Sequence, residues 1–221
     1  MRNRFYLDHR IMFHLFLAAL LFLAIPVYAK DWHELQDLTD VQLSEKISGF
    51  KERLEQNPSD FEALKALGIA YHIKARKDAK KYAPRAVKYL TRAYEINKKD
   101  YETVCYLGSA TTMMAKTTWN PIKKMSHVNK GTGLMDKAVR RDPNNISVRM
   151  TRAFNSKSLP SFLNRGEIAF EDFEYLADLI EKNPESYALI KKKVYANLAE
   201  LYKKAGDQVK AEKFRKLADS L

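Results

Sequence analysis

Two arginines spaced one helical turn apart, Arg149 and Arg152, are the residues of this sequence that most directly suggest chemistry. They lie in the stretch ISVRMTRA, shortly after Pro143, and a similar stretch follows Pro58. When the two stretches are aligned on their prolines, the arginines take the places of two leucines that are expected to point inward. Because a guanidinium group binds carboxylates and phosphates through several N–H donors, an inward pair of arginines could form an anion-binding site.

The alternative is that these arginines bind carboxylates of the protein itself. An unpaired charge in a protein interior is very costly, so inward arginines need partners. The candidates on neighbouring predicted helices are Asp136, Asp172 and Glu174. In that case both arginines have a structural role, and the sequence leaves the two hypotheses open.

A second candidate is the basic segment KTTWNPIKKMSHVNKG, residues 116–131, which contains Trp119. Tryptophan combines a large apolar area with an N–H donor and is enriched where proteins meet partners or membrane interfaces. With Lys123 and Lys124 nearby, Trp119 could dock on a partner protein or on a membrane surface. The alternative is a connecting segment in which Trp119 packs as a lid. The segment is too short and too weakly amphipathic to be a membrane helix.

Motifs for catalysis or metal binding are absent from the sequence. The stretch Gly131-Thr132-Gly133 lacks the third glycine and the preceding strand of a dinucleotide-binding loop, and no Gly-x-Ser-x-Gly elbow occurs. The histidines beyond residue 29 have no cysteine or carboxylate at metal-ligand spacing. Cys105, the only cysteine, lies in an apolar stretch and is predicted to be a packing residue. We therefore expect no enzymatic activity, no cofactor and no metal site.

The first 29 residues are predicted to be a secretory signal peptide. Arginines at the start are followed by an apolar run from Ile11 to Ile25, and small residues end at Ala29. This run is shorter than the roughly 20 residues that a membrane-spanning helix needs. We expect cleavage after Ala29 and a periplasmic or secreted protein. An uncleaved signal that anchors the protein in the inner membrane is the alternative.

The composition of the whole chain is typical of a soluble helical protein with a strong basic charge. The 221 residues include 7 glycines and 7 prolines, 30% are charged, and the formal net charge is +12. An exported protein does not normally meet chromosomal DNA. The basic charge therefore favours an acidic protein or peptide, a cell-wall polymer or lipid headgroups as the binding partner, and not nucleic acid. The alternative is that the lysines only solvate the helices.

A pattern of small and large residues recurs along the chain. Leu64-x-x-Leu67-Gly68-x-x-Tyr71 returns as Val104-x-x-Leu107-Gly108-x-x-Thr111 and as Tyr195-x-x-Leu198-Ala199-x-x-Tyr202. Each copy is followed by a second predicted helix with small residues, which include Ala86, Gly131 and Ala211. A glycine in a helix costs about 1 kcal/mol relative to alanine. We therefore expect Gly68 and Gly108 to lie where a partner helix approaches closely.

This pattern resembles the tetratricopeptide repeat, in which W-x-x-L-G-x-x-Y is followed by A-x-x-x-F and then P. The resemblance covers about Ser44 to Leu221, although the units are longer than the family's roughly 34 residues. It implies an all-α fold, a right-handed superhelix (α-solenoid) of about four stacked antiparallel helix pairs. Residues 30–58 would form a lead-in and a partial repeat, and residues 59–221 the repeat domain.

Several local expectations accompany this interpretation. A helix from Val41 to Gln56 should point Leu43, Ile47, Phe50 and Leu54 inward, with Trp32, Leu35 and Leu38 covering it. Ser59 and Glu62 should form a capping box. Asn120 and Pro121 should begin a long helix that ends at Arg141, and Pro84 and Pro160 should begin helices as well.

The resemblance also implies a concave groove lined by the first helix of each pair. The residues expected there are Lys65, Ile69, His72, Cys105, Ser109, Thr112, Glu200 and Lys203. This mixture would suit an acidic peptide or a C-terminal carboxylate, and the alternative is an ordinary solvated face. The sequence thus predicts an exported scaffold or adaptor for protein–protein interaction in the cell envelope. The alternative is a ligand-binding accessory component of a periplasmic transport system, with an anion pocket formed by Arg149 and Arg152.

Overall fold

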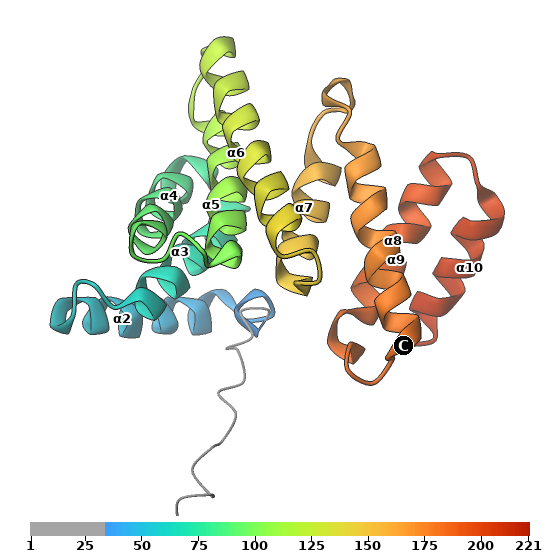
Figure 1. Ribbon diagram of the computed structural model, residues 1–221, viewed down its shortest axis with the longest axis horizontal. Coiled ribbons are helices and arrows are strands. Elements are labelled where there is room, and N and C mark those ends of the chain that lie inside the picture. Colours follow the sequence, from blue (N-terminus) through green and yellow to red (C-terminus); the bar gives the residue numbers. More distant parts are fainter. Residues whose placement is uncertain (1–33) are drawn as a thin grey trace, which may run out of the picture.

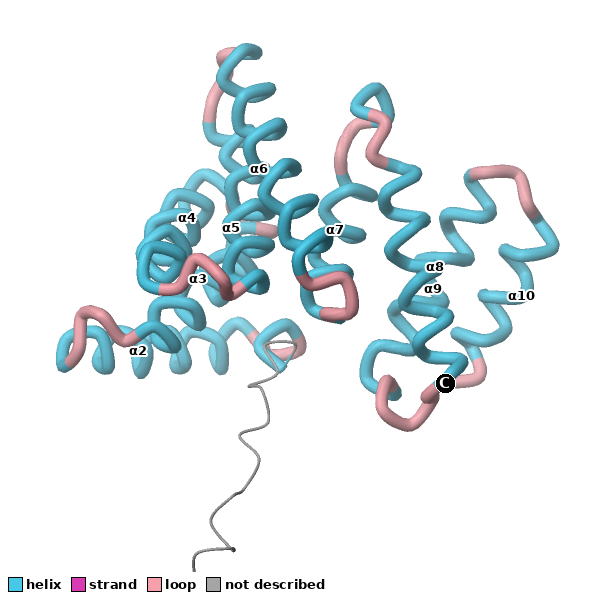
Figure 2. The backbone as a smooth tube through the Cα atoms, in the orientation of Figure 1, coloured by secondary structure: helices cyan, strands magenta, loops and turns pink. Residues whose placement is uncertain are grey.

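Residues 34–221 are the part of the chain that the structure, a computed structural model, describes, and this part is all-α. Its nine α-helices pack mostly against their neighbours in sequence, as antiparallel pairs (Figure 1, Figure 2). In chain order they are α2 (Asp40–Gln56), α3 (Phe61–Ala75), α4 (Ala79–Ile96), α5 (Tyr101–Met113), α6 (Pro121–Arg141), α7 (Ile146–Ser158), α8 (Gly166–Lys182), α9 (Ala188–Lys204) and α10 (Gln208–Asp219). The all-α class is confirmed for these residues, whereas the predicted signal peptide and Trp32 lie outside them.

Most of these helices are preceded by an N-cap residue. Its side chain accepts a hydrogen bond from the backbone N–H of the residue three positions later. The start of α6 is as predicted, since the Asn120 side chain accepts from the Lys123 N–H and Pro121 is the first helical residue. The predicted capping box at Ser59 is wrong. Asp60 caps α3 instead, because its carboxylate accepts from the Ala63 N–H and is held by the Arg53 guanidinium.

The predictions that Pro84 and Pro160 begin helices are also wrong. α4 already begins at Ala79, where the Asp78 side chain provides the cap, so Pro84 lies inside the helix. Pro160 precedes the short 3₁₀ helix η3 (Ser161–Leu163), and α8 begins only at Gly166. Asn164 lies between them with a φ of 52°, a left-handed conformation that ends η3 and turns the chain.

The apolar core runs along the chain in three consecutive clusters. The first joins α2 to α5, the second joins α5 to α7, and the third joins α7 to α10. The residues of the recurring pattern lie in or beside this core: Leu64, Leu67, Tyr71, Ala86, Leu107, Leu198, Tyr202 and Ala211 are buried, and Ala199 is half-buried. Neighbouring clusters share a helix, so each pair depends on the next for burial of its apolar side chains.

Helices approach closely at the glycines of the pattern. A Cβ atom on Gly68 would lie 2.5 Å from Cγ of Leu90 in α4. A Cβ atom on Gly108 would lie 2.6 Å from the carbonyl oxygen of Gly131 in α6. Both distances are far below van der Waals contact, and only a residue without a side chain fits at either position.

The segment before α2 covers the first helices. Leu35, in the 3₁₀ helix η1 (Glu34–Gln36), is buried, and Leu38 packs against the same cluster as Leu43, Ile47 and Phe50 of α2. The predicted cover is confirmed for these two leucines. Leu54, which was also expected to point inward, is half-buried. No helix among the described residues is both long and apolar enough to cross a membrane.

Candidate functional site

The first helices of successive pairs, α3, α5, α7 and α9, are linked side by side through polar side chains. Between α3 and α5, Lys65 Nζ lies 2.6 Å from Oε2 of Glu102. Between α5 and α7, Asn155 donates to Oγ1 of Thr112 at 2.6 Å. Between α7 and α9, Lys157 donates to Oδ1 of Asn197 at 2.7 Å and forms an ion pair with Glu200. We call these four helices the first-helix row.

Most residues expected to line an open groove are buried inside this row. The buried ones are Lys65, Ile69, His72, Cys105, Ser109 and Thr112, whereas Glu200 and Lys203 are exposed on α9. The physical reason is that α3 packs directly against α5, and α5 against α7, so the side chains between these helices are enclosed. The expectation that these six residues face a solvated groove is therefore corrected.

A buried polar chain crosses α3, α5 and α7. His72 Nε2 lies 2.8 Å from Ser109 Oγ, and Asn155 donates to both Ser109 and Thr112. His72 also packs edge-on against the ring of Tyr106. Nδ1 of His72 has no hydrogen-bond partner among the described residues. Burial, with a smaller contribution from the charge of Arg76, lowers the pKa of His72 to about 3.

This depressed pKa predicts a loss of stability in mild acid. The folded protein keeps His72 neutral down to about pH 3, whereas an unfolded histidine takes up a proton near pH 6.5. Below pH 6.5 the unfolded state therefore binds more protons, and stability that is present above this pH is lost as the pH falls. From pH 7 to pH 5 this single group should lower the free energy of unfolding by about 2 kcal/mol.

Urea unfolding at pH 7, 6 and 5 measures this effect when the wild type is compared with His72→Gln. The variant should lose about 2 kcal/mol less than the wild type over that range. His127→Gln is the matched control, since His127 is a partly exposed histidine on α6, and it should follow the wild type. Equal losses for the wild type and His72→Gln would contradict the prediction.

Cys105 behaves as a packing residue in the same row. Its side chain is fully buried, and Sγ lies 3.3 Å from the carbonyl oxygen of Val148, to which the thiol donates. Burial raises the pKa of the Cys105 thiol well above its usual range. The thiolate, which is the reactive form of cysteine, is therefore disfavoured at neutral pH.

Arg149 and Arg152 converge on the fully buried carboxylate of Asp172 in α8. Arg152 donates from Nε at 2.7 Å and from Nη2 at 2.8 Å, one bond to each carboxylate oxygen. Arg149 donates from Nη1 to Oδ1 of Asp172 at 2.8 Å and from Nε to the carbonyl oxygen of Pro143 at 2.6 Å. The Arg149 guanidinium also stacks on the ring of Tyr175, 3.7 Å from its centroid. These contacts give both guanidiniums partners within the protein.

Two further carboxylates complete this arginine cluster. Asp136 of α6 accepts from Arg152 and is held by Arg165 at 2.7 Å, and Glu171 lies 3.2 Å from Arg152. Burial alone would lower the pKa of Arg152, but the hydrogen bonds and charge of Asp172 raise it above its ordinary value. Through these ion pairs the two arginine side chains tie α7 to α6 and α8.

The partners predicted for the arginines are partly correct. Asp136 and Asp172 are partners, but Glu174 is not. Glu174 lies two residues beyond Asp172, which is roughly 200° around the helix. It therefore faces α9, where it accepts a hydrogen bond from the Tyr202 hydroxyl.

The described part of the lead-in segment, residues 34–39, lies across the first-helix row. Gln36 donates to the hydroxyl of Tyr106 in α5 at 3.3 Å and accepts from Arg76, the residue that ends α3, at 3.0 Å. Asp37 accepts from Lys193 of α9 at 2.6 Å. The segment thus contacts helices from three different pairs. Sequence reasoning missed Arg76, Tyr106 and Lys193, because they belong to no common motif and only the packing of α3, α5 and α9 brings them to one segment.

Trp119 lies on the surface, immediately before α6. Its side chain is 87% exposed, which excludes the alternative of a packed lid. Lys124 lies over its ring, with Nζ 5.7 Å from the centroid. Lys123 is exposed on the first turn of α6. Trp119, Lys123 and Lys124 are thus exposed residues at the start of α6, whereas the arginine cluster is buried.

No group of histidine, cysteine and carboxylate side chains in residues 34–221 is placed to hold a metal ion. Comparison of the chain with protein-family models finds no match, and comparison with curated proteins finds none either. The likeness to tetratricopeptide repeats consequently stays a prediction based on the spacing of small and large residues.

Proposed function

We propose that this protein is an exported scaffold that binds an acidic, leucine-containing segment of a partner protein along its first-helix row. In this proposal the helix pairs form a superhelix of the tetratricopeptide type. The antiparallel pairing of sequence neighbours and the close helix contacts at Gly68 and Gly108 support it. The basic and apolar leader in residues 1–29 supports export.

The position of the lead-in segment is the observation that carries this proposal. Its sequence ELQDL, residues 34–38, is acidic and contains two leucines. Leu35 is buried against the core, while Asp37 reaches Lys193 and Gln36 reaches Arg76 and Tyr106. The first-helix row thus already holds one acidic segment of the chain itself. A partner segment with the same alternation of leucine and acidic residues would use the same apolar and basic contacts.

A role as the ligand-binding accessory of a transport system has less support. That alternative requires a pocket in which Arg149 and Arg152 bind an external anion. Their donors point to Asp172, Pro143 and further internal acceptors, so an external carboxylate would have to displace buried ion pairs.

A peptide with the sequence of residues 30–40 tests the proposal when it is added to a protein whose own lead-in segment is loosened. In the variant Leu35→Ser/Asp37→Ser the segment loses its buried leucine and its ion pair with Lys193. Fluorescence anisotropy should show that the labelled peptide binds this variant. Binding to the wild type should be at least about tenfold weaker, because the tethered segment competes at a high effective concentration.

A further substitution locates the bound peptide. Adding Lys193→Glu to the loosened variant should weaken binding about tenfold, since it replaces the attraction for the peptide's aspartate by repulsion. Lys192→Glu, the same change at an exposed neighbour on α9, should leave the affinity within about twofold. Absence of binding to the loosened variant, or equal losses for both charge reversals, would contradict the proposed function.

A further inference from the structure

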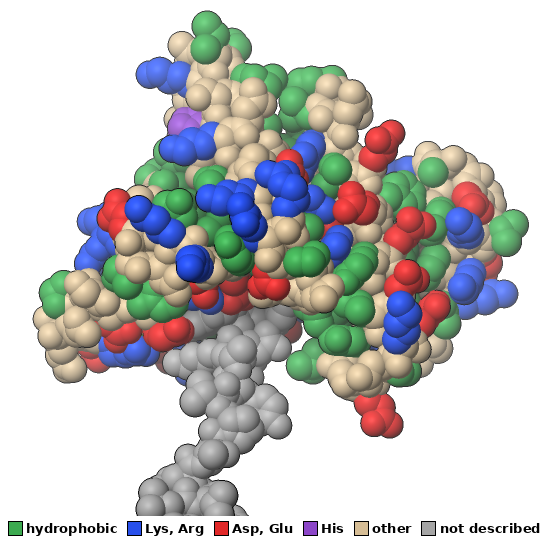
Figure 3. All heavy atoms as spheres, viewed as in Figure 1, with side chains coloured by type: hydrophobic (Ala, Val, Ile, Leu, Met, Phe, Trp, Pro, Cys, Tyr) green, Lys and Arg blue, Asp and Glu red, His purple; other side chains and the backbone are tan. Residues whose placement is uncertain are grey.

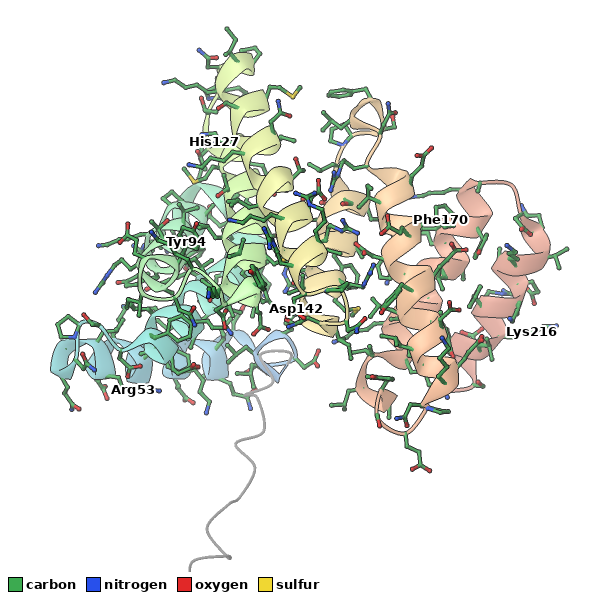
Figure 4. All side chains as sticks on the ribbon, viewed as in Figure 1. Arg53, Tyr94, His127, Asp142, Phe170 and Lys216 are labelled. Carbon is green, nitrogen blue, oxygen red and sulfur yellow. The ribbon has the colours of Figure 1, made fainter. Side chains whose placement is uncertain are left out.

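The N-terminal half of α6 projects from the rest of the molecule (Figure 1). Large apolar side chains are exposed on it and just before it. Trp119 is 87% exposed and Ile122 is 80% exposed, and Met125, one turn beyond Ile122, is partly exposed. Lys116, Lys123 and Lys124 are exposed around them. His127, labelled in Figure 4, lies on the same projecting half. We call residues 116–125 the α6 tip.

The charged residues around the α6 tip are all basic over a long stretch of the sequence. Between Glu102 and Asp136 the sequence contains no acidic residue, although the protein as a whole has 27. The same stretch contains four lysines, and Figure 3 shows basic side chains beside hydrophobic ones on this projection. A surface that binds the α6 tip should therefore be anionic.

The shape of the α6 tip indicates what kind of anionic surface that is. The exposed tryptophan and isoleucine stand on a convex, projecting end, so a rigid protein partner would need a matching cavity. A lipid bilayer needs none, because its interface accommodates inserted side chains. Tryptophan is favoured at the level of the headgroups, isoleucine in the acyl chains below, and lysine beside anionic phosphates. The α6 tip carries side chains suited to each of these three layers: Trp119, Ile122 and the lysines around them.

A second apolar projection faces the same side of the molecule. The connection between α7 and α8 rises on the side toward which α6 projects (Figure 1), and it contains Phe162, which is 72% exposed. From these observations we propose that the α6 tip docks on a lipid bilayer with anionic headgroups, with Phe162 as a second, weaker contact. This inference does not depend on the peptide-binding function of the first-helix row.

Fluorescence of Trp119 provides a local test in the full chain. The protein has two tryptophans, so Trp32→Phe leaves Trp119 as the only one. With vesicles of phosphatidylcholine containing about 30% phosphatidylglycerol, its emission should shift to shorter wavelength and be quenched by brominated acyl chains. With pure phosphatidylcholine vesicles both effects should be at least tenfold weaker at equal lipid concentration, and high salt should weaken the binding to anionic vesicles.

Variants at matched positions separate the α6 tip from a general effect of charge or of the leader. In the Trp32→Phe background, Ile122→Asp/Lys123→Glu should lower the vesicle affinity at least tenfold. Leu189→Asp/Lys192→Glu makes the same changes on α9, where Leu189 is 81% exposed, and should retain the affinity. All four positions are exposed, so the fold should persist, which circular dichroism verifies. Vesicle binding without quenching of Trp119, no binding at all, or an equal loss in both double variants would overturn the proposal.

Discussion

Replacing Asp172 with asparagine is expected to lower the free energy of unfolding by about 3–5 kcal/mol. The side chain of asparagine has nearly the same shape, but it leaves Arg149 and Arg152 buried beside a neutral amide. The desolvation penalty of two guanidiniums then loses its main compensation. Urea unfolding at pH 7 measures the loss, and Glu171→Gln is the control. Because Glu171 is largely exposed, its replacement should cost less than about 1 kcal/mol.

A compensated variant distinguishes charge from shape. Asp172→Leu together with Arg149→Met and Arg152→Met replaces the buried ions by apolar side chains of similar volume. Such replacements are frequently neutral or stabilising, and we expect this triple variant to lie within about 2 kcal/mol of the wild type. A triple variant as unstable as Asp172→Asn would show that the hydrogen bonds of Asp172, for which no apolar residue substitutes, hold α7 and α8 together.

Replacing Gly131 with alanine is expected to destabilise the protein by about 2–3 kcal/mol, a large effect for one methyl group. The new Cβ atom would lie 2.5 Å from the carbonyl oxygen of Gly108 and 2.8 Å from the backbone nitrogen of Thr112. Backbone atoms on α5 cannot rotate away as a side chain would, so α5 and α6 have to separate. Thermal or urea unfolding measures the loss.

Gly133 provides a control two residues away in the same helix. A Cβ atom on Gly133 would have no atom of the surrounding protein within 4 Å. Gly133→Ala should therefore stabilise the protein by up to about 1 kcal/mol, through the higher helix propensity of alanine. Opposite signs for the two substitutions would support close backbone contact between α5 and α6. If both stabilised the protein, the contact at Gly108 would be looser than the structure has it.

The first-helix row and the α6 tip are separate surfaces, formed by different residues, and we propose a different partner for each. The row holds the lead-in segment through Arg76, Tyr106 and Lys193, whereas the tip presents Trp119 and Ile122 to solvent. Substitutions at the tip should therefore leave peptide binding intact, and substitutions at Lys193 should leave vesicle binding intact. In our proposal the protein holds a partner segment while it rests on an anionic bilayer.

The sequence by itself determined the features that depend on neighbouring residues. Asn120 and Pro121 started a helix as predicted, because a side-chain cap and a fixed φ act within one turn. The glycines at positions 68 and 108 predicted close helix contacts, because a residue that weakens a helix needs a packing reason. Inward positions for Arg149 and Arg152 followed from the same periodicity, and the need for carboxylates followed from the cost of burying charge.

Only the tertiary structure decided which distant residues meet. Arg152 forms an ion pair with Glu171 and not with Glu174, because the rotation of α8 about its axis turns Glu174 toward α9. The tertiary structure enclosed Ser109 and Thr112 between first helices that the repeat pattern had suggested would border an open groove. It also brought Asp37 to Lys193 across most of the chain. These contacts depend on crossing angles and helix rotations that are fixed by the packing of many side chains together, and no local run of residues encodes them.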